Sequence, residues 1–367
     1  MRLGDYDIGL PVKRLPLLLL LAVVVMVAYG VIFVNSAAGR TGLAGKHLLW
    51  AGLGAVAFVA TFLVDFRVFV RAGYLAYAVG LLALVAVLFT APVKGARSWF
   101  DLGFMKAQPS EFMKLALIMA LARFLSARPG ALRARDLALA LALAGVPVAL
   151  ILKQPDMGTA MVCMPMIAAA VFVGGARLLH LGALAGSGAG GAVLVWFKAM
   201  HEYQRERVYA WIDPEPYKLG KAYQLIQSLI AVGSGGLLGK GLGQGTQNQF
   251  DLLPLKESDF IFSVIAEEGG FIAAAGLLVA VTVLLLAGTA IALHAADREG
   301  QIVAAMATAL LGGQAVINVA VCIGLLPTTG ITLPFVSYGG SSMLTCFVVA
   351  GLLANVAARP QKPGLFG

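Results

Sequence analysis

Long apolar runs separated by short polar segments extend over most of this 367-residue chain. A helix needs about 20 apolar residues to cross the hydrocarbon core of a bilayer. Stretches without Asp, Glu, Lys or Arg predict such spans at 15–39, 47–64, 72–93, 137–152, 157–176, 178–197 and 269–296. The window 300–358 is long enough for two more, separated by a turn around Pro327 to Gly340. One further span is predicted near 109–127, although it carries Glu111 and Lys114.

The distribution of Lys and Arg orients these spans. Short cytoplasmic loops carry an excess of basic residues, and here the excess falls on the side of Arg2, Lys13 and Arg14. We therefore expect an all-α polytopic membrane protein of ten transmembrane helices with both termini cytoplasmic. Residues 1–367 then form a single integral membrane domain, with one large extracytoplasmic loop at about 198–258 between helices 7 and 8. Residues 222–232 of this loop predict a short amphipathic helix, and a glycine-rich run follows up to Gly245.

Composition narrows the class of protein. The chain is 60% hydrophobic and only 12% charged, whereas soluble domains carry about 25% charged residues. This excludes a soluble enzyme, a disordered chain and a secreted disulfide scaffold. The net charge of +9 comes from basic residues in loops, which orientation and anionic lipid explain better than nucleic acid does. The three cysteines lie inside apolar stretches and lack the spacing of a metal site.

Two charged residues fall inside a predicted span, where an ionisable side chain costs roughly 3 kcal/mol on insertion scales. Glu111 and Lys114 are three positions apart, so they share one helix face and can pair. One interpretation is a buried ion pair that only joins two helices. The other is a role at a functional site.

Two further polar segments lie at the outer ends of predicted spans. The sequence Lys153-Gln154-Pro-Asp156 is either a tight turn with solvated charges or a polar wall facing a substrate head group. Ser258 is expected to cap the eighth span, which leaves Asp259 at its outer entrance. An acidic residue at a helix N-terminus is common in any protein, so its position alone does not establish catalysis.

Eight motifs between about residues 95 and 345 resemble, in order, those of the SEDS family (shape, elongation, division, sporulation), and its RodA branch most closely. They are Gly95-Ala-Arg97-x-Trp99, Gln108-Pro-Ser-Glu111-x-x-Lys114, Gln154-Pro-Asp156-x-Gly158-Thr159, Tyr203-Gln-Arg205, Tyr223-Gln-x-x-Gln-Ser228, Gly233-Ser-Gly-Gly236, Ser258-Asp259-Phe260 and Pro334-x-Val-Ser-Tyr-Gly-Gly-Ser341. One segment departs from the family: Leu255 and Glu257 replace a glutamate and a histidine, so no family role of those two residues carries over.

The resemblance implies a peptidoglycan glycosyltransferase that polymerises lipid II at the outer face of the cytoplasmic membrane during cell elongation. It implies an inverting reaction in which Asp259 acts as general base. Cations must face the departing pyrophosphate, and those expected on the correct side are Arg97, Lys114, Lys153, Arg205 and Arg207, with Glu111 holding Lys114 in place. Further expected substrate contacts are Gln154, Asp156, Gln227, Ser228 and Ser234.

The resemblance also implies partners. A class B penicillin-binding protein is expected to cross-link the product within the elongation machinery, because this chain contains no transpeptidase domain of its own. No cofactor is required by the sequence; a divalent cation, Mg or Mn, could assist the leaving group, although no dedicated metal site is evident. The alternative activity is a flippase that transports lipid II, and a third interpretation is a scaffold for the elongation machinery. Outer-side clustering of the polar motifs favours chemistry at the surface over transport.

Overall fold

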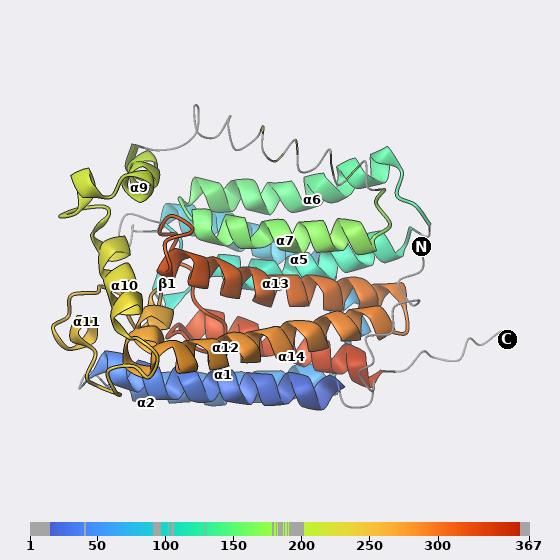
Figure 1. Ribbon diagram of the computed structural model, residues 1–367. Coiled ribbons are helices and arrows are strands. Elements are labelled where there is room, and N and C mark those ends of the chain that lie inside the picture. Colours follow the sequence, from blue (N-terminus) through green and yellow to red (C-terminus); the bar gives the residue numbers. More distant parts are fainter. Residues whose placement is uncertain are drawn as a thin grey trace.

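The apolar runs form long helices that lie side by side (Figure 1). The computed structural model describes residues 15–359 except for 40–41, 91–96, 102, 104–105, 129, 178–179, 181, 183–185, 187, 189 and 191–201. The helices of the bundle are α1 (Leu15–Ala38), α2 (Leu43–Leu63), α3 (Phe66–Arg71), α4 (Gly73–Ala86) with the 3-10 turn η3 (Val87–Phe89), α5 (Pro109–Ser126), α6 (Ala134–Lys153), α7 (Met157–Val173), α12 (Ile261–His294), α13 (Arg298–Cys322) and α14 (Gly340–Ala358).

Six of the described helices are long and apolar enough to cross a membrane, namely α1, α2, α6, α12, α13 and α14. The helix α4 with η3 and the helix α7 are shorter apolar segments, and α5 matches the predicted charged span. The fold class of an all-helical polytopic membrane protein is therefore confirmed. The span predicted at 178–197 lies largely outside the described residues.

The helices α13 and α14 lie at the centre of the bundle. In their most apolar stretches 72% and 78% of the residues are buried, against 22% in α2. Small residues allow close helix packing: a Cβ on Gly54 of α2 would overlap the ring of Phe347 in α14, and one on Gly288 of α12 would overlap Thr308 in α13. These two C-terminal helices are thus enclosed by the others, and buried residues of α1, α5, α7 and α12 complete the core.

The polar elements gather at one end of the bundle, on the left of Figure 1. They are α9 (Glu202–Ile212), the 3-10 turn η4 (Glu215–Tyr217), α10 (Tyr223–Ser234), α11 (Thr246–Gln249) and a two-stranded antiparallel hairpin of β1 (Phe100–Asp101) and β2 (Lys106–Ala107). The helix α10 confirms the amphipathic helix predicted at 222–232 to within two residues at its end. The sequence analysis did not anticipate the hairpin or α9.

A break divides α12 at Gly270, whose φ of 68° and ψ of −169° no helix allows. The predicted start at residue 269 marks this break rather than the start of the helix, because a separate half-helix precedes it from Ile261.

The glycine-rich run satisfies the backbone groups that the break releases. The carbonyls of Glu267 and Glu268 accept the amides of Lys240 and Gly241 at 3.0 Å each. The amides of Phe271 and Ile272 in turn donate to the carbonyls of residues 236 and 237 at 2.9 and 3.2 Å.

Two buried glutamates reinforce this junction. The Glu267 carboxylate accepts a hydrogen bond from Lys240 Nζ at 2.7 Å and another from the backbone amide of Gln247 at 3.1 Å. The Glu268 carboxylate accepts from Ser36 Oγ of α1 at 2.5 Å and from Asn248 Nδ2 at 2.7 Å. Buried carboxylates need such partners, so the two residues join α1 and the loop before α12 to the break in α12.

The glycine-rich contact predicts a position-specific loss of stability. A Cβ on Gly235 would lie 1.9 Å from the carbonyl oxygen of Ala266, so Gly235→Ala must push the loop away from α12. We expect it to lower the free energy of unfolding by about 1–3 kcal/mol. The readout is thermal unfolding of the purified protein in detergent.

Gly233→Ala is the matched control, because nothing lies within 4 Å of its Cβ position and it sits in α10. Alanine in a helix is favoured over glycine by about 0.5–1 kcal/mol, so this variant should be as stable as the parent or more so. Equal unfolding temperatures for the two variants would contradict the assigned contact.

Candidate functional site

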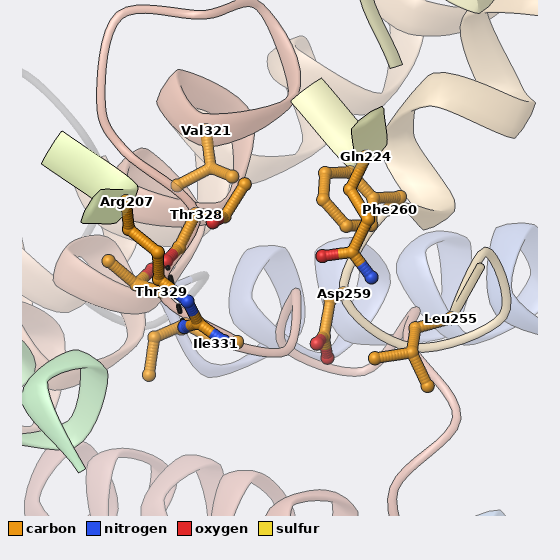
Figure 2. A pocket seen from close by; sticks show the side chains of 10 residues that line it. Arg207, Gln224, Leu255, Asp259, Phe260, Val321, Thr328, Thr329 and Ile331 are labelled. Atoms are coloured by element: carbon orange, nitrogen blue, oxygen red, sulfur yellow. Dashed lines mark hydrogen bonds between the residues drawn. The ribbon is translucent and has the colours of Figure 1, made fainter. Parts of the chain in front are cut away.

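A polar cavity of about 230 Å³ lies where α12 begins, between the loop helices and the segment that joins α13 to α14 (Figure 2). Two residues predicted from the sequence, Asp259 and Arg207, line it. The Asp259 carboxylate and the Arg207 guanidinium stand on facing sides of the open space. The cavity is completed by Gln224, Leu255, Phe260, Val321, Thr328, Thr329, Gly330 and Ile331.

Asp259 is held in a turn and not in a helix. The turn contains Leu255 at a φ of 58°, a left-handed conformation that β-branched residues would resist. The Leu255 carbonyl accepts the backbone amide of Asp259 at 3.0 Å. The helix α12 starts only at Ile261, with Phe260 as its N-cap residue. The prediction that Ser258 caps this helix is therefore wrong, since the turn ends two residues later than the sequence pattern indicated.

Contacts on both sides fix this turn. The Lys256 ammonium is buried and donates to the carbonyl of Asn248 at 2.5 Å and to Asp251 Oδ1 at 2.6 Å. That hydrogen bond holds the pKa of the exposed Asp251 carboxyl below its usual value. Ser337 Oγ donates to the carbonyl of Ser258 at 2.5 Å. The backbone that carries Asp259 is thus joined both to residues 248–251 and to the segment before α14.

Arg207 supplies the positive charge of the cavity. It projects from α9 and donates through Nη1 to the carbonyl of Thr328 at 3.3 Å. On the same helix, Trp211 Nε1 donates to the carbonyl of Gly324 at 2.8 Å. These two bonds attach α9 to the loop between α13 and α14. Arg205, also predicted as a substrate contact, is half-buried on the same helix.

The segment 328–331 forms the wall beside the carboxylate, and the sequence analysis missed it. A Cβ on Gly330, which has a φ of 72°, would lie 3.5 Å from Asp259 Oδ2, so the backbone passes close to the acid. The available signal was the sequence Leu326-Pro-Thr-Thr-Gly330, which was interpreted only as a turn between two spans. Only long-range packing brings that turn to Asp259.

Glu111 and Lys114 form the predicted ion pair at the start of α5. Lys114 Nζ lies 2.9 Å from Glu111 Oε1, and the two side chains are 1% and 6% exposed. The second carboxylate oxygen, Glu111 Oε2, is buried and has no hydrogen-bond partner among the described residues. Neither residue lines the Asp259 cavity.

Asp156 connects the start of α5 to the start of α7. It caps α7 by accepting the amide of Thr159 at 3.0 Å, and it also accepts Gln108 Nε2 at 2.8 Å. Gly158, the second residue of α7, packs against the carbonyl of Thr329 and the side chain of Ile331. The Asp156 corner therefore lies behind the wall of the Asp259 cavity rather than within it.

The remaining predicted contacts do not line the cavity. Gln154 is fully buried and donates to the carbonyl of Leu84 at 2.9 Å. Ser228 is also fully buried, with its hydroxyl 2.6 Å from that of Ser263. Of the others, Arg97, Lys153 and Ser234 are exposed, and Gln227 is half-buried.

The donor set around the cavity bears on metal binding. Among the residues that the structure describes, no group of three or more His, Cys, Asp or Glu side chains is placed to hold a metal ion. Asp259 is the one carboxylate among the residues lining the cavity. Mg²⁺ is commonly held by one or two carboxylates together with substrate phosphates. A cation delivered with a diphosphate would fit this arrangement, and a divalent cation stays a prediction.

Comparison with known proteins gives consistent matches along the whole chain. The FtsW, RodA and SpoVE family, described as cell cycle proteins, matches residues 13–362. Stage V sporulation protein E of Bacillus subtilis (strain 168) is 38% identical over 358 residues, which cover 93% of this chain and 96% of that protein. The peptidoglycan glycosyltransferase MrdB of Escherichia coli (strain K12) is 35% identical over 340 residues and covers 92% of both chains.

Solved structures agree. A chain from a peptidoglycan synthase complex, studied for its coordination of polymerization and crosslinking, superposes with a TM-score of 0.79 at 36% identity, over 92% of this chain and 96% of that one. The rod shape determining protein RodA of Thermus thermophilus superposes with a TM-score of 0.69 at 32% identity, over 92% of this chain and 94% of that one. The arrangement of helices is therefore that of RodA.

The buried ion pair predicts an asymmetric response to substitution. Lys114→Met leaves the Glu111 carboxylate buried without its cation, and breaking one side of a buried pair costs about 3–5 kcal/mol. The double variant Glu111→Gln/Lys114→Met removes both charges, so it should recover most of that loss. Thermal unfolding in detergent measures both. A single variant as stable as the double would show that the two side chains are not energetically coupled.

Proposed function

We propose that this chain, which belongs to the FtsW, RodA and SpoVE family of cell cycle proteins, polymerises lipid II with Asp259 as general base. It is a peptidoglycan glycosyltransferase and a multi-pass protein of the bacterial cytoplasmic membrane. The observation that carries the proposal is the cavity in which the Asp259 carboxylate faces Arg207.

The proposed reaction transfers a glycosyl group with inversion. Asp259 takes the proton from the attacking sugar hydroxyl as its oxygen bonds to the anomeric carbon of the lipid-linked sugar. The bond from that carbon to the diphosphate oxygen breaks on the opposite face, and the lipid diphosphate leaves with the bonding electron pair. General base catalysis of this kind contributes about 10²–10⁴-fold in rate.

Arg207 is the cation we assign to the leaving diphosphate. Its guanidinium faces Asp259 across the cavity, and a planar guanidinium suits bidentate contact with phosphate oxygens. Fixed positive charge at the developing anion stabilises the transition state. Arg205 lies on the same helix and would extend this positive surface.

The other predicted contacts would act outside the reacting centre. We propose that the exposed Arg97, Lys153 and Ser234 contact the parts of the substrate that extend beyond the cavity. Asp156 lies behind the cavity wall and would act by shaping it. Lys114 does not line the cavity, and Glu111 keeps the role of holding it in place. For the buried Gln154 and Ser228, and for the half-buried Gln227, the expected substrate contact would require a rearrangement around each side chain.

The proposed topology has ten spans, with both termini in the cytoplasm, in a single domain covering residues 1–367. The segment 198–258 would be the extracytoplasmic loop, because it carries α9 and α10 over the Asp259 cavity. Supporting contacts come from α1 and α14. Ser36, near the end of α1, reaches Glu268 at the loop end of the bundle, whereas Asn355, near the end of α14, reaches residues 61–64 at the opposite end.

A transpeptidase partner is the second part of the proposal. The similar chain of known structure belongs to a peptidoglycan synthase complex that coordinates polymerization and crosslinking. We infer that this chain likewise acts with a class B penicillin-binding protein, which would cross-link the strands that Asp259 helps to form.

The catalytic assignment predicts that Asp259→Asn loses about 10²–10⁴-fold in rate, because an amide cannot accept the hydroxyl proton. The assay follows conversion of lipid II to glycan polymer by the purified protein with its partner. Glu215→Gln is the matched control, since that carboxylate is exposed in the same loop, 80% accessible. Polymerisation by Asp259→Asn at the parental rate would eliminate this residue as the base.

The same assay addresses two remaining questions about the reaction. Repeating it with chelator and with added Mg²⁺ or Mn²⁺ tests the proposed cation at the diphosphate. Lipid II that crosses the bilayer without being polymerised by the parent protein would instead support a flippase.

We further propose a role in elongation, supported by the similarity to MrdB and to the rod shape determining protein RodA. The sporulation relative SpoVE is the competing assignment. Expression in a strain depleted of its own RodA should restore rod shape, and Asp259→Asn should not. Rescue only of a strain lacking SpoVE would overturn the elongation role.

A further inference from the structure

A single buried amide connects the two walls of the Asp259 cavity. Asn318 lies in α13 and is 1% exposed. Its Nδ2 donates to the carbonyl of Asp259 at 2.8 Å and to the carbonyl of Ile331 at 2.7 Å. The first carbonyl belongs to the turn that carries the acid, and the second to the loop segment on the other side of the cavity.

Neither carbonyl belongs to regular secondary structure, so each depends on a side-chain partner. Asp259 precedes the first residue of α12, and Ile331 lies in the loop between α13 and α14. The additional contact of Cys322 Sγ with the Asp259 carbonyl, at 3.7 Å, is a weak thiol hydrogen bond. Asn318 therefore provides the strong bond to Asp259 and, through the same nitrogen, the link to the opposite wall.

We propose that Asn318 is a positioning residue for the glycosyl transfer, which sets the separation between Asp259 and the loop segment 328–331. The inference rests on the function proposed above. A catalytic base must be held within hydrogen-bond distance of its proton. A displacement of about 1 Å at a reacting centre can cost about 10²-fold in rate.

Only an amide of this length has the required hydrogen-bonding capacity. The Asn318 side chain offers two N–H donors and uses them on two carbonyl acceptors. An aspartate of the same shape has one donor when protonated and none when ionised, so at least one carbonyl would lose its partner. A leucine fills the space but donates nothing, and a glutamine keeps both donors on a chain one methylene longer.

A neighbour on the same helix separates positioning from simple packing. Gln314 lies one turn earlier in α13 and is equally buried, at 1% exposure. Its Oε1 accepts a weak hydrogen bond from Cys346 Sγ of α14 at 3.8 Å, and it does not line the cavity. Gln314→Leu thus removes a buried amide from α13 without touching Asp259.

The experiment measures kcat, KM and the unfolding temperature of the full-length protein with its partner, using lipid II as substrate. The variants are Asn318→Asp, Asn318→Leu, Asn318→Gln and Gln314→Leu. We expect kcat to fall about 10–100-fold in Asn318→Asp and Asn318→Leu, with KM changed less than about threefold. Asn318→Gln should recover part of kcat, and Gln314→Leu should stay within about threefold of the parent.

Two results would overturn the inference. The first is an Asn318→Asp variant that is folded, as judged by its unfolding temperature, and has the parental kcat. The other is Gln314→Leu losing as much kcat as the Asn318 variants, which would make both residues general supports of α13. A parent protein without any polymerising activity would instead refute the proposed function, so the two failures are distinguishable.

Discussion

The end of the bundle that carries the polar elements depends on the backbone hydrogen bonds between the glycine-rich run and the break in α12. A membrane-embedded helix cannot expose unpaired backbone groups, so a break requires partners from elsewhere in the chain. The glycine-rich run supplies these partners because its backbone comes into direct contact with the backbone of α12. At Gly239, which has a φ of 80°, a Cβ would lie 2.1 Å from the carbonyl oxygen of Glu268. This pairing separates the half-helix that follows Asp259 from the half that crosses the membrane.

Three buried glutamates, Glu111, Glu267 and Glu268, each have a structural partner. Glu111 is neutralised by Lys114 and Glu267 by Lys240, and Glu268 is bound by neutral donors from α1 and the loop. A buried charge has a large desolvation cost. Removing one partner of such a pair therefore destabilises the protein by more than the intact pair stabilises it. The contacts of Glu267 and Glu268 link the loop, and for Glu268 also α1, to α12, whereas the Glu111–Lys114 pair lies within α5. Asp259 lies in the turn before α12, where its backbone carbonyl accepts a hydrogen bond from Asn318 and its side chain lines the cavity.

Sequence patterns predicted most of the bundle, since charge-free windows mark spans directly: the window 15–39 corresponds to α1, and 157–176 to α7. The break at Gly270 was not predictable because two adjacent glycines in an apolar run also fit close helix packing. The cap expected at Ser258 failed because the left-handed turn at Leu255 depends on contacts far along the chain. In the site, Asp259 belonged to a family motif and Arg207 was expected only as a cation on the same side, whereas Asn318 was an amide within an apolar window to which the sequence assigned no role. The two carbonyls that bind Asn318 can be identified only from the packing of α13 against both walls of the cavity.

The size of the Asp259 cavity constrains how any long product is handled. Pockets that enclose a drug-sized ligand usually measure about 300–1,000 Å³, and this one is about 230 Å³. Under the proposed function, a cavity of this size would hold the edge of one sugar and its reacting oxygen, and the rest of both substrates would stay outside the protein. The growing polymer would then need no exit tunnel, and its length would not be set by the space within the enzyme. Chain length becomes a matter of how long the polymer end stays bound at the cavity mouth between successive additions.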